Sequence, residues 1–356
     1  MTSTTDATPP IFDGHNDILT KIYNAGGRKA VPRFADHPQW HITREKARRG
    51  GFAGGFFAIW IPSPMDMDQR YADMSGGQYD LPLPTQVPRA EALDVALQQA
   101  AILFDLQDAG YLQICTEVSQ LKSCMASGKV AAILHMEGAE AVDQDFRTLD
   151  VLYNLGLRSL GPVWSRPTDY GHGVPFRYPS SPDIGDGLTV AGKELVRYCN
   201  RRKIMLDLSH LNEKGFWDVA EISDAPLVAT HSNVHAICPH ARNLTDEQLD
   251  AIRQSDGMVG VNFAVAFLRP DGQMRADIGL DTVLRHLDDL IEKLGEDRVG
   301  FGSDFDGAMM PQDIGSCGDL GRLRQAMHDH GYSAALMAKL CHENWMALLD
   351  RTWGPA

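Results

Sequence analysis

Two residues near the start of the chain could bind a metal ion together. His15 and Asp17 end a short apolar segment that begins at Ile11, and side chains two residues apart on a strand point the same way. An imidazole and a carboxylate that face one space suit a divalent cation such as zinc. Because many chains contain such a pair by chance, the pair alone favours a structural hydrogen bond, and a metal site requires further ligands.

Further candidate ligands stand at the ends of four later apolar segments. They are, with the segments that they end, Glu137 (129–137), His210 (204–210), His231 (226–231) and Asp304 (299–304). Each has an ordinary alternative, since a histidine after Ser209 could cap the next helix and Glu137 before Gly138 could be a solvated loop residue. Six such residues at equivalent positions favour one shared metal site over six separate structural roles.

The number and types of these residues indicate more than one metal ion. A catalytic zinc ion takes three protein ligands and a water molecule, so three histidines, two aspartates and one glutamate exceed a single site. Two-metal hydrolases hold their ions about 3.5–4 Å apart. Glu137 is the best candidate to bridge them, because a carboxylate can offer one oxygen to each ion. Asp304 is the natural general acid and base, since hydrolysis moves a proton from water to the leaving amine.

Eight short apolar segments that alternate with helical patterns must position these residues. The expected strands cover residues 11–17, 50–60, 129–137, 157–164, 204–210, 226–231, 257–263 and 299–304. The expected helices cover residues 89–109, 146–155, 190–202, 213–222, 245–255 and 281–294. Alternation without antiparallel hairpins favours a parallel sheet, and eight units favour closure into a (β/α)8 barrel of the TIM type. The C-terminal ends of all strands then share one face, where active sites lie.

No repeat, low-complexity tract or break in composition divides the chain. Residues 1–356 are therefore expected to form a single barrel domain, with C-terminal helices from about residue 320. The passage from the first strand to Arg49 is expected to be rich in loops. Two further long loops, over residues 61–87 and 165–188, are expected to shape the mouth of the site, because long loops in compact domains are usually functional or disordered.

The charge balance argues against some classes of partner. With 47 acidic and 33 basic residues the formal net charge is −14, which disfavours nucleic acid and anionic membranes. No run of about 18 apolar residues predicts a membrane span, and the first ten residues lack the features of a signal peptide. The six cysteines form no C-x-x-C pair. A reducing, cytoplasmic location is therefore expected.

Six motifs in the chain resemble those of a known enzyme family. They are DGHND at 13–17, HMEGAE at 135–140, DLSH at 207–210, THS at 230–232, ARN at 241–243 and GSDFDG at 302–307. In this order they are similar to the motifs of the renal (membrane) dipeptidase family, whose members are binuclear zinc peptidases of the amidohydrolase-like barrel class. The resemblance runs from about residue 11 to about residue 349, so it covers nearly the whole chain.

The resemblance implies a role for each matching residue. The two implied ligand sets are His15, Asp17 and Glu137 for one zinc ion, and Glu137, His210 and His231 for the other. Arg242 matches the family arginine that pairs with the substrate carboxylate, a task that suits a bidentate guanidinium. Asp304 matches the catalytic aspartate. Asp306 would lie on the same strand face two residues on, in a supporting or structural role, and His135 could orient Glu137 from behind.

The implied activity is the hydrolysis of dipeptides, including those with a C-terminal D-residue. A hydroxide that bridges the two zinc ions would attack the peptide carbonyl, and Asp304 would move the proton to the leaving amine. Because Arg242 would hold the free carboxylate, the substrates would be dipeptides or N-acyl amino acids. The resemblance also favours a homodimer.

The chain departs from the family pattern at one position. Where family members often carry a histidine near the scissile carbonyl, this chain has Trp164, which offers an N–H donor and a bulky apolar wall. His172, which has a glycine on each side, could enter the site from its loop in place of that histidine, or could be a solvated loop residue.

Two other functions are open to the same barrel. A related binuclear amidohydrolase could act on cyclic amides or on N-acyl amino acids, and Arg242 distinguishes it, because cyclic substrates need no free carboxylate. A metal-containing barrel that only binds a small molecule is the other alternative. The retained Asp304 argues against it, since a protein that only binds its ligand needs no proton carrier.

Overall fold

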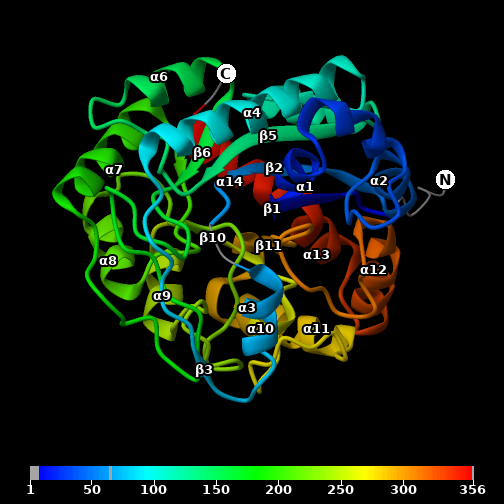
Figure 1. Ribbon diagram of the computed structural model, residues 1–356. Helices are drawn as coiled ribbons and strands as arrows, with labels where there is room; N and C mark the ends of the chain where they lie inside the picture. The colour runs from blue at the N-terminus through cyan, green and yellow to red at the C-terminus, as the bar shows by residue number, and fades with distance from the viewer. Residues whose placement is uncertain (1–7, 64–65, 355–356) are drawn as a thin grey trace.

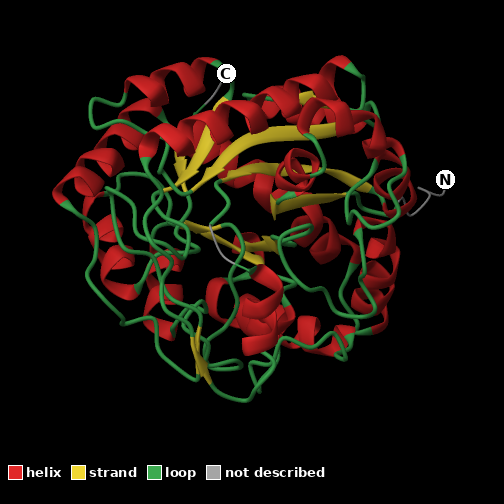
Figure 2. Cartoon of the chain, in the orientation of Figure 1, coloured by secondary structure: helices red, strands yellow, loops and turns green. Residues whose placement is uncertain are grey.

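Eight parallel strands form the inner wall of a near-closed barrel, and helices surround them (Figure 1 and Figure 2). The computed structural model describes residues 8–63 and 66–354. The eight strands are β1 (Ile11–Asn16), β2 (Phe52–Trp60), β5 (Val130–Glu137), β6 (Leu157–Gly161), β8 (Met205–Leu206), β9 (Val228–Ala229), β10 (Met258–Val261) and β11 (Val299–Phe301). The (β/α)8 prediction is confirmed.

The order of strands in the sheet shows how the barrel closes. Ladder pairing runs β8-β6-β5-β2-β1-β11-β10-β9, and every neighbouring pair in it is parallel. β8 and β9, at the two ends of this order, are joined by an isolated parallel bridge between Asp207 and Val228. Leu208 N donates to Val228 O at 2.8 Å across the same seam. The seam is short because both strands are short.

Three strands were not predicted from the sequence. β4 (Leu112–Ile114) pairs with the first half of β5, while β6 pairs with its second half, so β5 has two neighbours along one edge. β3 (Tyr79–Asp80) and β7 (Arg177–Tyr178) form an antiparallel pair, which contradicts the expectation of parallel pairing alone. This pair joins the two long loops over residues 61–87 and 165–188, and the first of them also contains α3 (Met67–Asp73).

Several strands end earlier than predicted. At these points a polar side chain accepts hydrogen bonds from backbone N–H groups, or the backbone adopts a conformation that a strand cannot contain. The Asp207 carboxylate accepts hydrogen bonds from Ser209 N and Thr230 N, at 3.1 and 2.9 Å. Asp304 and Asp306 have φ angles of 61° and 69°, a left-handed conformation that a strand cannot contain. The expectation that these two aspartates share a strand face is therefore wrong, since both lie in the loop after β11.

The predicted helices are present within a few residues of their expected bounds. They are α4 (Arg89–Asp108), α6 (Arg147–Asn154), α7 (Val190–Arg202), α8 (Glu213–Ile222), α9 (Asp246–Gln254) and α11 (Leu280–Leu294). The chain ends with α12 (Leu320–Asp329), α13 (Ala334–Ala338), η4 (Lys339–Glu343) and α14 (Asn344–Trp353). Besides α3, helices that were not predicted are α1 (Ile18–Asn24), α2 (Arg44–Gly50), α5 (Val118–Ala126) and α10 (Val265–Leu268), with short turns at η1 (Gly27–Ala35), η2 (Glu296–Arg298) and η3 (Cys317–Asp319).

The passage before Arg49 is therefore mostly helical rather than loop-rich. α1 buries Ile18, Leu19 and Ile22, and this apolar face outweighs the polar composition of the rest of the passage. In the described part of the chain, no helix is long and apolar enough to cross a membrane. All six cysteines are free and buried, consistent with the absence of a disulfide pattern in the sequence.

Candidate metal centre and active site

The predicted site residues lie at the C-terminal ends of the strands, as the barrel requires. His15 belongs to β1, Asp17 directly precedes α1, and Glu137 is the last residue of β5. His210, His231 and Asp304 lie in the loops after β8, β9 and β11. The five predicted ligands are at most 6% exposed, whereas Asp304 is partly exposed.

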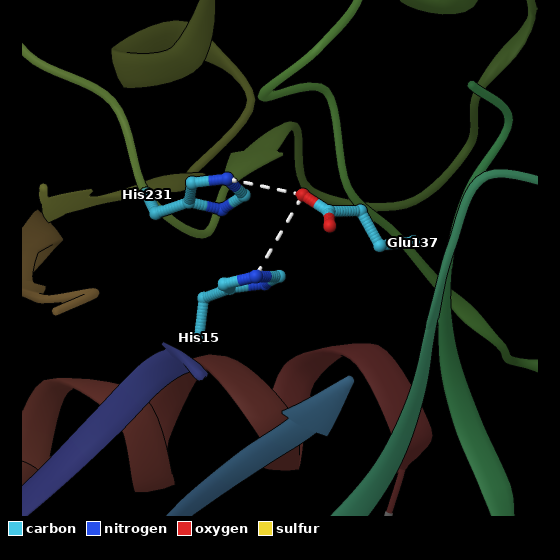
Figure 3. A group of neighbouring side chains, drawn as sticks. All are labelled: His15, Glu137 and His231. Atoms are coloured by element: carbon cyan, nitrogen blue, oxygen red, sulfur yellow. Dashed lines mark ion pairs between the residues drawn. The ribbon is translucent and has the colours of Figure 1, made fainter. Parts of the chain in front are cut away.

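Three imidazoles converge on one oxygen of Glu137. Glu137 Oε1 lies 2.9 Å from His210 Nε2, 3.3 Å from His231 Nε2 and 3.6 Å from His15 Nε2. Figure 3 shows His15 and His231 reaching the carboxylate from different elements. The two nitrogens His210 Nε2 and His231 Nε2 are 3.1 Å apart.

A second group of ligand atoms adjoins the first through His15. His15 Nε2 is 3.2 Å from Asp17 Oδ2. Ligand atoms of His15, Asp17 and Asp304 all lie within 4.8 Å of one another, as do those of His15, Glu137 and His231. The structure thus brings the five predicted ligands and Asp304 into one buried site with two overlapping clusters.

Hydrogen bonds to Thr230 and Asp207 indicate the tautomer of His231, that is, which of its ring nitrogens carries the proton. Thr230 Oγ1 donates to Asp207 Oδ2 at 2.7 Å, so its proton is committed to that carboxylate. Thr230 Oγ1 is also 2.8 Å from His231 Nδ1, and it can only accept there, so Nδ1 carries the imidazole proton. In the neutral ring, Nε2 therefore presents a lone pair to Glu137 Oε1. Two lone pairs at 3.3 Å suit a cation between them.

The pKa values of the clustered side chains also bear on metal binding. Burial lowers the pKa values of His210 and His231 well below the usual range, and Arg242 lowers them further, so both rings are neutral as metal ligands must be. Burial lowers the pKa of His15, but Glu137 and Asp17 outweigh it and raise the value to about 10. Burial raises the pKa of Glu137 well above its usual range. A bound metal ion would displace the proton of His15, so the donor set of three imidazoles and two carboxylates fits zinc.

Several residues that position the ligands were not identified from the sequence. Asp207 and Thr230 orient His231, and Ser165 Oγ lies 2.9 Å from His210 Nδ1. Asp13 on β1 accepts hydrogen bonds from Ser303 N and Ser303 Oγ, which fixes β1 to the loop that carries Asp304. The available signal was their position, because each is a polar residue close to the end of a predicted strand.

A cavity of about 270 Å³ opens beside the cluster. Glu137, His210 and Asp304 lie in its wall. Its larger apolar side chains are Trp60, Trp164, Phe176, Phe267 and Met274. The Trp164 ring is 5.9 Å from the His210 ring. His172 is half-buried and is not among the described residues that line this cavity.

Arg242 lies behind the histidines rather than in the cavity wall. Its guanidinium donates to the backbone oxygens of Ser209 and His231 and to Ser232 Oγ. The side chain is almost fully buried, and burial lowers its pKa to about 10. Among the described residues that line the cavity, the cationic side chain is Lys21.

A buried ion pair fixes the loops around the cavity and was also missed. Arg166 donates through Nε and NH2 to Glu140 Oε1, at 3.0 and 2.6 Å, and through NH2 to Ile61 O at 3.0 Å. These contacts connect the loops after β6, β5 and β2. Asp306, expected in a supporting role, accepts hydrogen bonds from the backbone N–H groups of His41 and Ile42, at 2.8 and 3.0 Å.

Comparison with known proteins identifies the family. The model of the membrane dipeptidase family, peptidase family M19, matches residues 4–352. The chain belongs to this family. It is 54% identical to a metallopeptidase from Rhodobacter sphaeroides whose crystal structure holds a phosphinate mimic of the dipeptide L-Ala-D-Ala, with a TM-score of 0.94 over 98% of this chain and 100% of that one. The prediction of a metallo-dipeptidase is confirmed.

Two other similar proteins share less of the sequence. An uncharacterized protein from the PQQ-III 3′ region of Acinetobacter calcoaceticus is 44% identical over 80% of this chain and 90% of its own length. A probable dipeptidase, PvdM from Pseudomonas aeruginosa, has a TM-score of 0.80 over 98% of this chain and 96% of that one. At 22% identity, PvdM supports the fold alone.

Proposed function

We propose that the chain hydrolyses dipeptides, including those that end in a D-residue, with two zinc ions bound at the strand ends. The observation that carries the proposal is the convergence of three imidazole nitrogens on Glu137 Oε1, at 2.9 to 3.6 Å, beside a cavity of about 270 Å³. The bound mimic of L-Ala-D-Ala in the related structure supports the substrate class.

Each side chain has a role in this proposal. His15, Asp17 and Glu137 hold one ion, and Glu137, His210 and His231 hold the other. When bound, the two ions supply Lewis-acid polarisation of the carbonyl and a nucleophile at neutral pH. Asp304, in the cavity wall beside Asp17, carries the proton to the leaving amine. The aromatic wall around Trp164 packs against the substrate and excludes water from it.

The proposal is tested by metal content together with dipeptide turnover. We expect close to two zinc ions per chain in the wild type, in Asp304→Asn and in the control Asp350→Asn, whose carboxylate is exposed and pairs with Lys122 at 3.2 Å. Turnover of L-Ala-D-Ala and L-Ala-L-Ala should fall by about 10²–10⁴-fold in Asp304→Asn only, because it lacks the proton carrier. Absence of stoichiometric metal after zinc reconstitution would contradict the proposal.

One observation favours a second candidate, a binuclear amidohydrolase that acts on cyclic amides. Arg242, the expected partner of a substrate carboxylate, donates through its two terminal nitrogens to Ser209, His231 and Ser232. Its buried Nε has no hydrogen-bond partner among the described residues, and Arg242 is not among the described residues that line the cavity. A cyclic amide needs no such partner. Two bound metals with turnover of a hydantoin or a dihydropyrimidine, and none of dipeptides, would select this candidate.

A further inference from the structure

We propose that Asn262 is a positioning residue, which holds the Asp304 carboxylate in the orientation needed for proton transfer. The inference rests on the role proposed above for Asp304. Asn262 directly follows β10, at the same end of the barrel as the metal cluster, and its side chain is fully buried. Its Nδ2 donates to Asp304 Oδ2 at 3.0 Å and to the backbone oxygen of His231 at 3.4 Å.

The orientation of the Asn262 amide is fixed by its other contacts. Its Oδ1 accepts a hydrogen bond from Ala264 N at 2.6 Å, so the oxygen faces the backbone and the NH2 group faces Asp304. The backbone of Asn262 is held as well, because Asn262 N donates to Asn233 Oδ1 at 3.1 Å and Asn233 Nδ2 donates to Asn262 O at 2.9 Å. Because hydrogen bonds hold both the side-chain oxygen and the backbone of Asn262, its NH2 group can orient the Asp304 carboxylate that it contacts.

The backbone of Asp304 is held, since its N–H donates to His15 O at 3.0 Å, but among the described residues the hydrogen bond to its carboxylate comes from Asn262. Asp304 lies in a loop after the short strand β11, with a left-handed φ of 61°. Ligand atoms of Asp17 and Asp304 lie within 4.8 Å of each other, and two carboxylates this close repel. The bond to Oδ2 opposes that repulsion and leaves Oδ1 to exchange a proton with the substrate.

The proposal predicts that Asn262 acts only through Asp304, and a double-mutant cycle tests this. Asn262→Asp keeps the shape and the acceptor for Ala264 N but turns an oxygen toward Asp304. We expect kcat for L-Ala-D-Ala to fall by about 100-fold, because a small misplacement of a reacting group has this effect, while KM and zinc content stay close to those of the wild type. Asn262→Ala removes the donor without adding a charge, so its loss of kcat should be smaller.

The Asp304→Asn background separates positioning from a general structural role. There, Asn262→Asp and Asn262→Ala should change the residual kcat by less than about twofold, since coupled residues are not additive. An equal loss in both backgrounds, or a loss of zinc in either single variant, would overturn the proposal for Asn262 alone. If Asp304→Asn kept wild-type turnover, the proton-carrier role of Asp304 itself would fall.

A buried asparagine away from the site provides the control. Asn344 is 3% exposed and donates to Glu296 O and Val299 O, at 2.7 and 2.8 Å, near the start of β11. Asn344→Ala should lower the melting temperature and leave kcat unchanged. If Asn344→Ala lowered kcat as much as Asn262→Ala does, the loss would reflect weakened folding rather than positioning, and the proposal would be wrong.

Discussion

The two ends of the barrel interior are equally buried but are built from opposite kinds of side chain. β1 contributes Phe12 to the N-terminal end and His15 to the C-terminal end, and β5 likewise contributes Ile133 and then Glu137. The N-terminal end is one apolar cluster, closed by Trp345. Figure 1 shows α14, the helix that contains Trp345, lying behind the strands. Burial therefore stabilises one end directly and imposes a cost at the other.

The C-terminal end of the barrel interior, called here the polar end, offsets the cost of burying polar groups only in part with its own hydrogen bonds. Asp207 accepts four, from the backbone N–H and the hydroxyl of both Ser209 and Thr230. In contrast, His15 Nδ1 and His135 Nε2 are buried without a hydrogen-bond partner among the described residues. Because a buried network with unpaired groups is costly, the polar end stabilises the fold less than the apolar end does.

The largest expected effect comes from removing the charge at the centre of the polar end. Glu137→Gln should lose bound zinc and reduce turnover by on the order of a thousandfold or more, because the metal ions supply several kcal/mol of transition-state stabilisation. The metal-free variant should be at least as stable as the metal-free wild type, since burial disfavours the ionised carboxylate. Zinc analysis and thermal unfolding check both points. Two zinc ions retained per chain would contradict the assigned ligand set.

A matching change at the apolar, N-terminal end should lower stability and leave turnover and zinc binding intact. Trp345→Ala should lower the free energy of unfolding by about 3–5 kcal/mol, because it opens a cavity. It also removes the indole N–H that donates to Phe301 O at 3.1 Å. The kcat/KM per folded molecule should stay close to that of the wild type, since Trp345 is not among the described residues that line the cavity. Urea unfolding and turnover measure the two effects. Lost zinc with unchanged stability would show that the two ends are not independent.

The sequence predicted that polar residues would gather at the C-terminal ends of the strands, but it did not predict the contacts that these residues make. Apolar segments that end in His, Asp or Glu indicated both the barrel and the face that carries the site, because these patterns are local. β4 was missed because three residues show no clear alternation. The predicted ends of β8 and β11 were too long because Asp207 and Asp304 divert the backbone, which depends on neighbours distant in the chain.

The orientation of individual side chains also depended on closure of the barrel. Asn262 meets Asp304, and Thr230 meets Asp207, only when β8 to β11 lie side by side. The family resemblance placed Arg242 at the substrate, yet its terminal nitrogens donate to the backbone oxygens of Ser209 and His231, and its Nε has no hydrogen-bond partner among the described residues. The roles of Arg242 and His172 toward a substrate remain predictions that the panel of dipeptides and cyclic amides tests.

The smallest expected effect concerns the hydroxyl that orients a ligand at the polar end. Thr230→Val keeps the shape of the side chain but removes the acceptor for His231 Nδ1–H and the donor to Asp207. The imidazole could then exchange its tautomer, so zinc affinity should fall by about 10–100-fold. At saturating zinc, kcat should stay near that of the wild type, because no group that contacts the substrate changes.

A hydroxyl at the apolar end gives the matched control for this change. Thr352 is 6% exposed and donates to Leu348 O at 3.0 Å within α14. Thr352→Val should leave zinc affinity unchanged, which a competitive chelator titration measures for both variants. Equal zinc affinity in Thr230→Val and Thr352→Val would show that the tautomer of His231 is fixed by the ion itself. In that case the hydrogen bonds of the polar end would serve folding rather than metal binding.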